Sequence, residues 1–174
     1  MLPVIILDLD KTGIEFISPA ASQIVMEDKT RKQGWIKGKS AFLFADYNGS
    51  GCADFPEESE LKTKDEPIIV GLVRNDVNKD RRLDAQDPFY QQLYLWQDKN
   101  EDGLCTPTEV RSLSSYGISL EFDFILNITT VNDNKTVWEF SYSVTQPDQY
   151  GNMRLSKGHK AINALLVDKF IPNW

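Results

Sequence analysis

The sequence contains few of the residues from which catalytic and redox sites are most often built. It has one histidine, two cysteines and three methionines among 174 residues. His159 has no nucleophile beside it in a recognisable motif, so a hydrolase has little support and His159 is interpreted as a surface residue. Two cysteines say little about the redox compartment. A bond between Cys52 and Cys105 stays open, but two partly buried free thiols are the preferred interpretation.

Long apolar runs and an excess of positive charge are absent as well. No stretch of eighteen apolar residues exists, so no membrane-spanning helix is expected. The apolar start, residues 1–7, is too short for a signal peptide and lacks a basic region, so any export signal is expected outside this sequence. Lys and Arg number 19 against 26 Asp and Glu, and the net charge of −7 argues against nucleic acid or an anionic membrane surface as a partner.

What the sequence does contain is acidic loops with the ligand spacing of calcium sites, and the clearest is residues 98–109. Oxygen-bearing residues stand at positions 1, 3, 5, 9 and 12 of a twelve-residue EF-hand loop, and Gly103 stands at position 6, where the chain turns sharply. Calcium takes six to eight oxygen ligands, which this spacing wraps around one point. The alternative is a polar surface turn. The predicted ligands are Asp98, Asn100, Asp102, Leu104 through its carbonyl, Thr106 and Glu109.

Two loops of the same kind lie upstream. The first, residues 46–57, has Gly51 at the turn and the weaker ligand Ser50 at position 5. Its predicted ligands are Asp46, Asn48, Ser50, Cys52 through its carbonyl, Asp54 and Glu57.

The second loop, residues 76–87, departs from the pattern twice. Arg81 replaces the turn glycine at about 1–2 kcal/mol if its φ is positive, and Asp87 is shorter than the usual glutamate. A weaker or less calcium-selective site is expected. Its predicted ligands are Asp76, Asn78, Asp80, Arg82 through its carbonyl, Asp84 and Asp87. Two or three bound Ca²⁺ ions are therefore predicted. A half-loop at Asp8, Asp10 and Thr12 has the right spacing but no closing acid.

Apolar periodicity predicts helices around these loops. Residues 66–75 form one apolar face behind Pro67, and Phe89, Leu93 and Trp96 recur at helical spacing within residues 88–97. An exit helix is expected at residues 107–115, ended by Gly117. The second and third loops would then be neighbours, as in a paired EF-hand.

The two ends of the chain predict strands. Residues 4–7 are a short β-branched run, and residues 34–36 and 41–44 are expected as two strands joined by a turn. Apolar residues alternate over 118–128 and again over 138–144, which predicts a long hairpin. A polar loop is expected at 146–157 and an apolar strand or short helix at 164–171.

These elements predict an α+β fold in which paired EF-hand-like calcium loops and helices pack on antiparallel strands from both termini. Residues 1–174 are expected to form a single calcium-binding domain. Its parts would be strands with the first loop in 1–65, the paired EF-hand-like region in 66–116, and a hairpin with a C-terminal segment in 117–174.

The order of these motifs resembles the EF-hand-like calcium-binding module of bacterial repeat-in-toxin (RTX) exported proteins. The resemblance covers about residues 3–125, and the most specific stretch is Leu95-Trp-x-Asp-x-Asn100. It implies a module, within a long toxin or adhesin that is secreted or displayed at the cell surface, that is unfolded at low cytoplasmic calcium and folds after export. Its partners would be other domains of the same polypeptide.

The chain is also similar to the self-processing module of some of these proteins. That resemblance implies calcium-dependent cleavage of an Asp-Pro bond before Pro3, through an aspartyl anhydride that a lysine amine can capture. Leu2 stands where the aspartate should be, so the electrophile is missing. Two further departures are Lys11-Thr12, where the family has Gly-Asp, and residues 27–32, where an acidic repeat is expected.

Three functions compete. A calcium-dependent folding module is the first, and a self-cleaving enzyme is the alternative, which depends on the native residue before Pro3. A calcium sensor that opens a groove for target helices is the third. Sensors use Met-rich helical faces, and Met1, Met26 and Met153 lie outside the predicted helices.

Overall fold

The structure is a computed structural model that describes residues 2–25, 32–55, 58, 68–125, 129–131 and 134–166. At its centre is a strand whose apolar run, Val4 to Leu7, is completely buried. Val4 and Ile6 belong to one hydrophobic core, while Ile5 and Leu7 belong to a second. Successive side chains of a strand point to opposite faces, so this strand separates the two cores.

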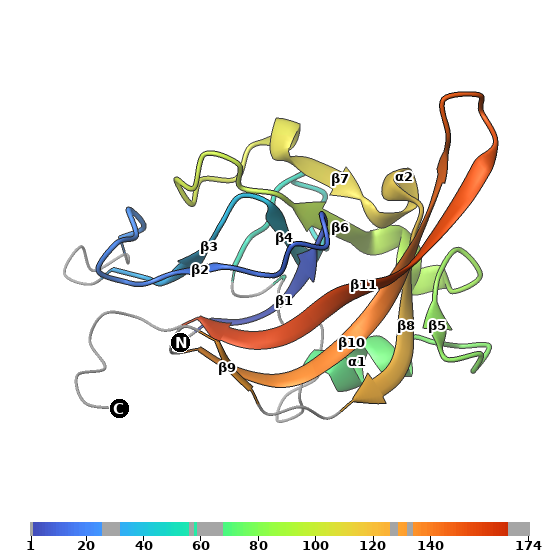
Figure 1. Ribbon diagram of the computed structural model, residues 1–174, viewed down its shortest axis with the longest axis horizontal. Helices are drawn as coiled ribbons and strands as arrows, with labels where there is room; N and C mark the ends of the chain where they lie inside the picture. Colours follow the sequence, from blue (N-terminus) through green and yellow to red (C-terminus); the bar gives the residue numbers. More distant parts are fainter. Residues whose placement is uncertain are drawn as a thin grey trace.

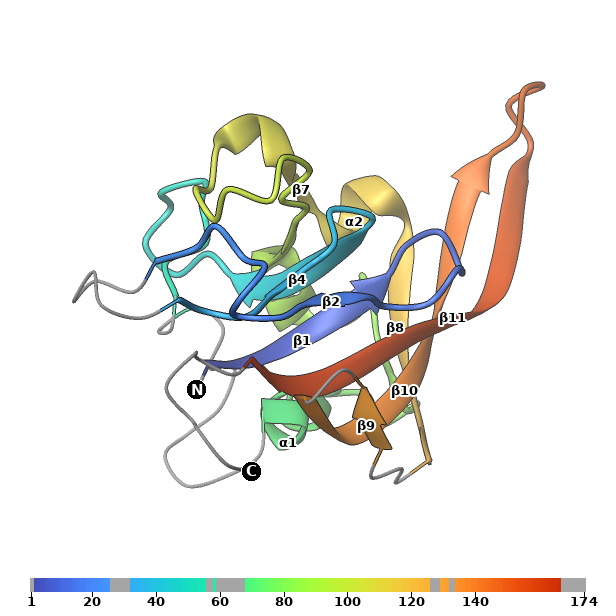
Figure 2. The same cartoon turned by 60° about the vertical axis from the view of Figure 1, so that its left-hand side comes forward.

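One antiparallel sheet makes up most of the molecule (Figure 1). Its strands follow the order β5-β8-β10-β11-β1-β4-β6-β7, and β9 pairs with β10. Figures 1 and 2 show β10 and β11 twisting together across the molecule. A second sheet contains β2 and β3. The strands are β1 (Leu2–Asp8), β2 (Phe16–Ile17), β3 (Trp35–Ile36), β4 (Ser40–Ala45), β5 (Arg82–Leu83), β6 (Leu93–Trp96), β7 (Val110–Ser112), β8 (Ile118–Ile125), β9 (Thr129–Val131), β10 (Asn134–Pro147) and β11 (Met153–Leu166).

The helices are short. They are α1 (Ile68–Arg74), α2 (Leu113–Tyr116) and the 3₁₀ turns η1 (Pro88–Gln92) and η2 (Pro107–Glu109). The predicted α+β class with paired EF-hand helices is therefore wrong, because the described part of the chain is mainly antiparallel strand. Within the described residues, no helix is long and apolar enough to cross a membrane.

The predicted helix over residues 88–97 fails at Leu93. Residues 93–96 form β6, which pairs with β4 through Ala45↔Leu93 and Phe42↔Trp96. Leu93 and Trp96 then lie in different cores, so the two side chains do not share one buried face despite their helical spacing. Pairing with a central strand outweighs local helical propensity here.

The predicted exit helix over residues 107–115 is also wrong. The chain forms η2, then β7 beside β6, then the single turn α2. Gly117 does end that turn, with φ of 66°. A side chain at this position would collide with the carbonyl oxygen of Thr145.

The predicted strands fare better. The runs 4–7 and 41–44 lie in β1 and β4, α1 lies inside the predicted 66–75 helix, and β8 pairs with β10 as the alternation predicted.

Three of the other strand predictions need changes. Residues 35–36 pair with β2 rather than with β4. The expected polar loop at 146–157 is the end of the β10–β11 hairpin, which turns at residues 148–152. β11 covers the start of the predicted 164–171 segment, and the remainder lies outside the described residues.

Candidate calcium loops

The three predicted loops share one backbone conformation. In each, the residues at loop positions 4 and 6 have positive φ. The angles are 71° and 76° for Gly49 and Gly51, 60° and 67° for Lys79 and Arg81, and 61° and 72° for Glu101 and Gly103. Arg81 thus adopts the left-handed conformation that its place in the motif required, although it is not a glycine.

The carboxylate at position 1 closes each turn. Its Oδ2 accepts the backbone N–H of position 6, at 3.1 Å for Asp46, 2.9 Å for Asp76 and 2.8 Å for Asp98. The asparagine at position 3 accepts the N–H of position 5 in every loop, at 2.7, 3.1 and 3.4 Å. The side-chain oxygen of position 5 likewise accepts the N–H of position 7 in every loop. These bonds gather the side-chain oxygens of positions 1, 3 and 5 on the inside of the turn.

The closing acids of the second and third loops accept backbone N–H groups of their own loops, and Asp87 thereby ties the end of the second loop to its start. Asp87, 1% exposed, accepts the N–H groups of Val77 at 2.8 Å and Asp84 at 3.2 Å, which are positions 2 and 9. In the third loop, Glu109 accepts the N–H of Thr106, position 9, at 3.2 Å.

Glu58 takes this role in the first loop. It is 2% exposed and accepts the N–H groups of Tyr47 and Asp54, positions 2 and 9, both at 3.0 Å. The sequence pattern missed Glu58, because a twelve-residue loop ends one residue earlier. Glu57 lies outside the described residues, and its ligand role stays a prediction.

The half-loop at residues 8–13 has the same conformation. Lys11 and Gly13 have φ of 63° and 98°, and Gly13 N–H donates to Asp8 Oδ2 at 2.9 Å. Asp8 is 2% exposed and its Oδ1 has no hydrogen-bond partner. Lys39 Nζ donates to Thr12 Oγ1 at 2.8 Å, and its ion pair with Glu15 raises the Lys39 pKa. An ammonium group therefore stands beside this loop.

The first and third loops are neighbours. The backbone N–H of Ala53 donates to Cys105 Sγ at 3.3 Å. Phe55, at the end of the first loop, packs its ring against Phe42 and Trp96, with centroids 5.5 and 5.6 Å apart. Ala53 and Phe55 of the first loop and Cys105 of the third loop thus pack against the core that contains Val4 and Ile6.

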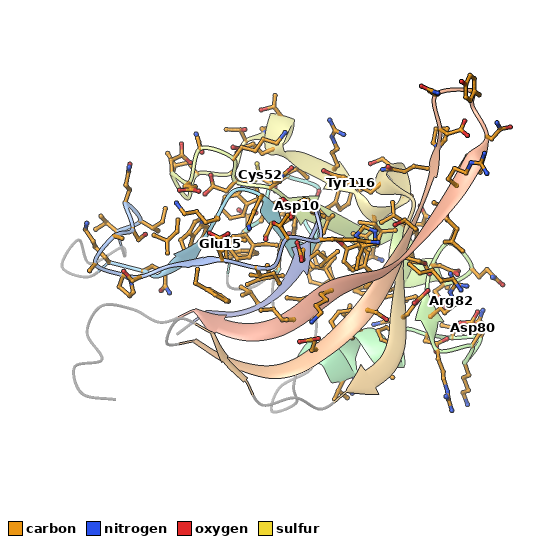
Figure 3. The ribbon with its side chains drawn as sticks, in the orientation of Figure 1. Asp10, Glu15, Cys52, Asp80, Arg82 and Tyr116 are labelled. Carbon is orange, nitrogen blue, oxygen red and sulfur yellow. The ribbon has the colours of Figure 1, made fainter. Side chains whose placement is uncertain are left out.

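The second loop lies elsewhere. Its Arg82 and Leu83 form β5, which pairs with β8, and Phe122 N–H donates to the Arg81 carbonyl at 2.8 Å. Figure 3 shows Asp80 and Arg82 beside β5 and β8, away from Cys52. The predicted pairing of the second loop with the third is wrong, since β5 and β7 stand at opposite ends of the strand order.

A segment far upstream holds the third loop. Trp35 Nε1 donates to Asp98 Oδ2 at 2.7 Å, and Lys37 Nζ pairs with Glu101 at 3.2 Å. Asp98 is 1% exposed, and burial raises the pKa of its carboxyl group. Sequence reasoning missed these partners, because nothing in residues 35–37 points to a loop sixty residues away.

The donor set of the loops consists of oxygen atoms. The described residues show no group of three or more His, Cys, Asp or Glu side chains gathered to hold a metal. A calcium loop of this kind also uses amide, hydroxyl and carbonyl oxygens. Asp76 Oδ1, at position 1, is a buried oxygen without a hydrogen-bond partner. An all-oxygen set with an orphaned carboxylate oxygen suits a hard cation.

Comparison with known proteins gives two findings. The model of the SPM domain matches residues 5–153. The iron-regulated protein FrpA of Neisseria meningitidis serogroup C is 30% identical over 153 residues. That alignment includes 80% of this chain but 14% of FrpA, so the chain spans a small part of that relative's length. Both findings agree with the resemblance to a module of RTX proteins.

Proposed function

Because the chain belongs to the SPM domain family, we propose that it is a calcium-binding module of a larger exported bacterial protein and that it folds on binding calcium outside the cell. The observation that supports this most is the shared conformation of the three loops, with positive φ at positions 4 and 6. Three loops of different sequence adopt it, including one with arginine at the turn. Its partners would be the other domains of the same polypeptide.

The residues that would hold calcium are the predicted ligands of the three loops. The side-chain oxygens at positions 1 and 5, carboxylates except for the Ser50 hydroxyl, already point inward, because each accepts a backbone N–H of its own turn. A bound ion would neutralise carboxylates that otherwise repel one another, and Asp98, whose pKa burial raises, would gain most from a nearby positive charge.

Linkage converts this binding into folding. An ion that binds only the folded state stabilises it by RT ln(1 + [Ca]/Kd), about 2.7 kcal/mol per site at a hundredfold excess over Kd. Millimolar extracellular calcium suits loops with a serine at position 5 or an arginine at the turn. The third loop connects β6 to β7, and the second loop contains β5, which pairs with β8. Ordering these loops by calcium would therefore also stabilise the sheet.

The test is a calcium titration of the metal-stripped protein by calorimetry, with near-ultraviolet circular dichroism alongside. We expect two or three ions to bind and the aromatic signal to rise, because Trp35 touches the buried carboxylate of the third loop. An unchanged spectrum and no heat up to several millimolar calcium would contradict the proposal.

Family membership favours a second candidate, calcium-dependent self-processing. Cleavage needs an aspartate before Pro3 whose side-chain carboxylate attacks its main-chain carbonyl carbon. The C–N bond to proline then breaks, the proline nitrogen takes up a proton and leaves as an amine, and a cyclic anhydride remains. Leu2 has no such group. We expect Leu2→Asp to cut itself in calcium but not in chelator, which intact-protein mass spectrometry detects as the loss of residues 1 and 2. Leu2→Asn, equal in size but without the carboxylate, is the control. An uncut Leu2→Asp protein that binds calcium would reject this candidate.

A further inference from the structure

The two cysteines of the chain meet across the first and third loops. Cys52 is at position 7 of the first loop and Cys105 at position 8 of the third, and both are half-buried free thiols. Cys105 Sγ accepts the N–H of Ala53 at 3.3 Å. The amide nitrogen of Ala53 is bonded to the carbonyl carbon of Cys52, so Cys105 Sγ lies within about 6 Å of Cys52 Cα. The Cys52 thiol is also near enough to contribute to the raised pKa of Cys105, although burial is the larger cause.

The calcium sites leave both thiols unused. Cys52 is a predicted ligand through its carbonyl oxygen only, and Cys105 is not a predicted ligand. A disulfide has Cα atoms about 4.4–6.8 Å apart, and Cys105 Sγ already lies against the backbone that carries Cys52. Partial exposure gives a small oxidant access to the pair.

We propose that Cys52 and Cys105 form a disulfide that joins the first loop to the third in an oxidising medium. The oxidant is a small-molecule disulfide such as oxidised glutathione. One cysteine thiolate attacks it, forming a mixed disulfide and releasing one glutathione thiol. The second cysteine then attacks the bound sulfur, forming the S–S bond and releasing the other. Two protein thiols are oxidised and one disulfide is reduced.

The bond would act as a staple between ligand loops. It closes a ring from residue 52 to residue 105 and so restricts the unfolded chain. It also fixes the loops side by side, and the oxidised protein should therefore need less calcium to fold. This last consequence rests on the proposed function, whereas formation of the bond does not.

The test is incubation in a glutathione redox buffer with calcium, followed by alkylation of the remaining thiols. The buffer is held at pH 8.5, because thiol–disulfide exchange proceeds through a thiolate. We expect a monomer with neither cysteine alkylated, a cross-linked peptide pair by mass spectrometry, and a melting temperature higher on the order of 5–10 °C. The same buffer with urea should give much less disulfide, since unfolding separates the thiols.

Cys52→Ser and Cys105→Ser are the matched controls, each of which should show one alkylated thiol and no redox-dependent melting. Full alkylation of the native protein after oxidation, or a disulfide between two chains, would overturn the proposal. A repeat in chelator separates the two ideas. An intramolecular disulfide with no calcium dependence of melting would support the disulfide and reject the folding module. Calcium-dependent folding with unreacted thiols would support the folding module and reject the disulfide.

Discussion

Arg81 occupies position 6 of the second loop, where the calcium-loop motif has glycine. Its φ is 67°, a conformation that costs a non-glycine residue about 1–2 kcal/mol, and its N–H and carbonyl are both fixed, by Asp76 and Phe122. We predict that Arg81→Gly raises the free energy of unfolding by about 1 kcal/mol, after the greater chain entropy of glycine is subtracted. Urea titration in calcium measures it.

Arg81→Ala is the control for this prediction. Alanine removes the guanidinium but keeps the unfavourable φ, so it should give little gain. If alanine stabilises as much as glycine, the effect comes from charge in an acidic loop and the backbone argument fails.

His159 corrects an interpretation made from sequence. It is 8% exposed rather than a surface residue, with its ring 4.8 Å from that of Tyr142 and its Nε2 3.0 Å from Ser156 Oγ. Burial, and secondarily the charge of Lys11, lowers its pKa below the usual 6.5. Nothing in the sequence showed this, because the residues around His159 in β11 are mostly polar.

The sign of the His159 effect follows from linkage. Below pH 6.5 the unfolded chain binds a proton that the folded protein binds only at lower pH, so stability falls as the pH drops from 6.5 through the folded pKa. We predict that, between pH 7.5 and pH 5.5, the melting temperature of His159→Gln falls less than that of the unsubstituted protein. Parallel losses in the two proteins would show that other groups dominate.

At the scale of elements, the loop conformation and several strands were predictable, but β6 and β7, on either side of the third loop, were not. The loop conformation depends on bonds within six residues, such as Asp98 with Gly103, so spacing alone identifies it. Whether Leu93–Trp96 is helix or strand depends on pairing with β4, about fifty residues upstream. The local spacing of apolar residues gives no information about that pairing. Glu58 was missed for the opposite reason, because it departs from the motif by one position.

The closing acid of the first loop gives a prediction at this scale. Glu58 holds positions 2 and 9 together, as Asp87 does in the second loop. We predict that Glu58→Gln weakens calcium binding at the first loop about tenfold or more, because a neutral amide replaces a buried carboxylate whose two oxygens both accept bonds. Glu57→Gln is the control in calorimetry. A larger loss of calcium affinity from Glu57→Gln would show that the loop closes at Glu57, as the twelve-residue motif predicts.

Contact between loops gives another prediction. Glu109→Gln should remove the ion of the third loop and weaken the first, because Ala53 and Cys105 join these loops, while the second loop on β8 is unaffected. The control is Glu101→Gln, which removes the same charge from position 4 of the same loop, outside the ligand set. Calorimetry should show one ion fewer for Glu109→Gln only. Equal stoichiometry in both variants would contradict the assignment of Glu109.

For the whole molecule, the sequence indicated the family better than the architecture. The resemblance to an RTX module came from loop motifs that lie close together along the chain, and the family match agrees with it. The sheet depends instead on β1 pairing with β11 across most of the sequence, for instance Leu7↔Ala161. Alternation within a strand shows which faces are apolar but not which strand lies alongside.

That pairing makes the extent of the folding unit testable. The family match ends at residue 153, where β11 begins, yet β11 lies between β1 and β10 and pairs with both. Without it, the central strand loses one whole edge, and the core loses Ala161 and Ile162, which are 0% and 6% exposed. We predict that a chain ending at residue 152 shows no cooperative melting in calcium, whereas one ending at Leu166 melts like the full chain. Cooperative folding of the shorter chain would mean that calcium loops and the first 152 residues suffice, and that β11 is an addition to a unit already stable.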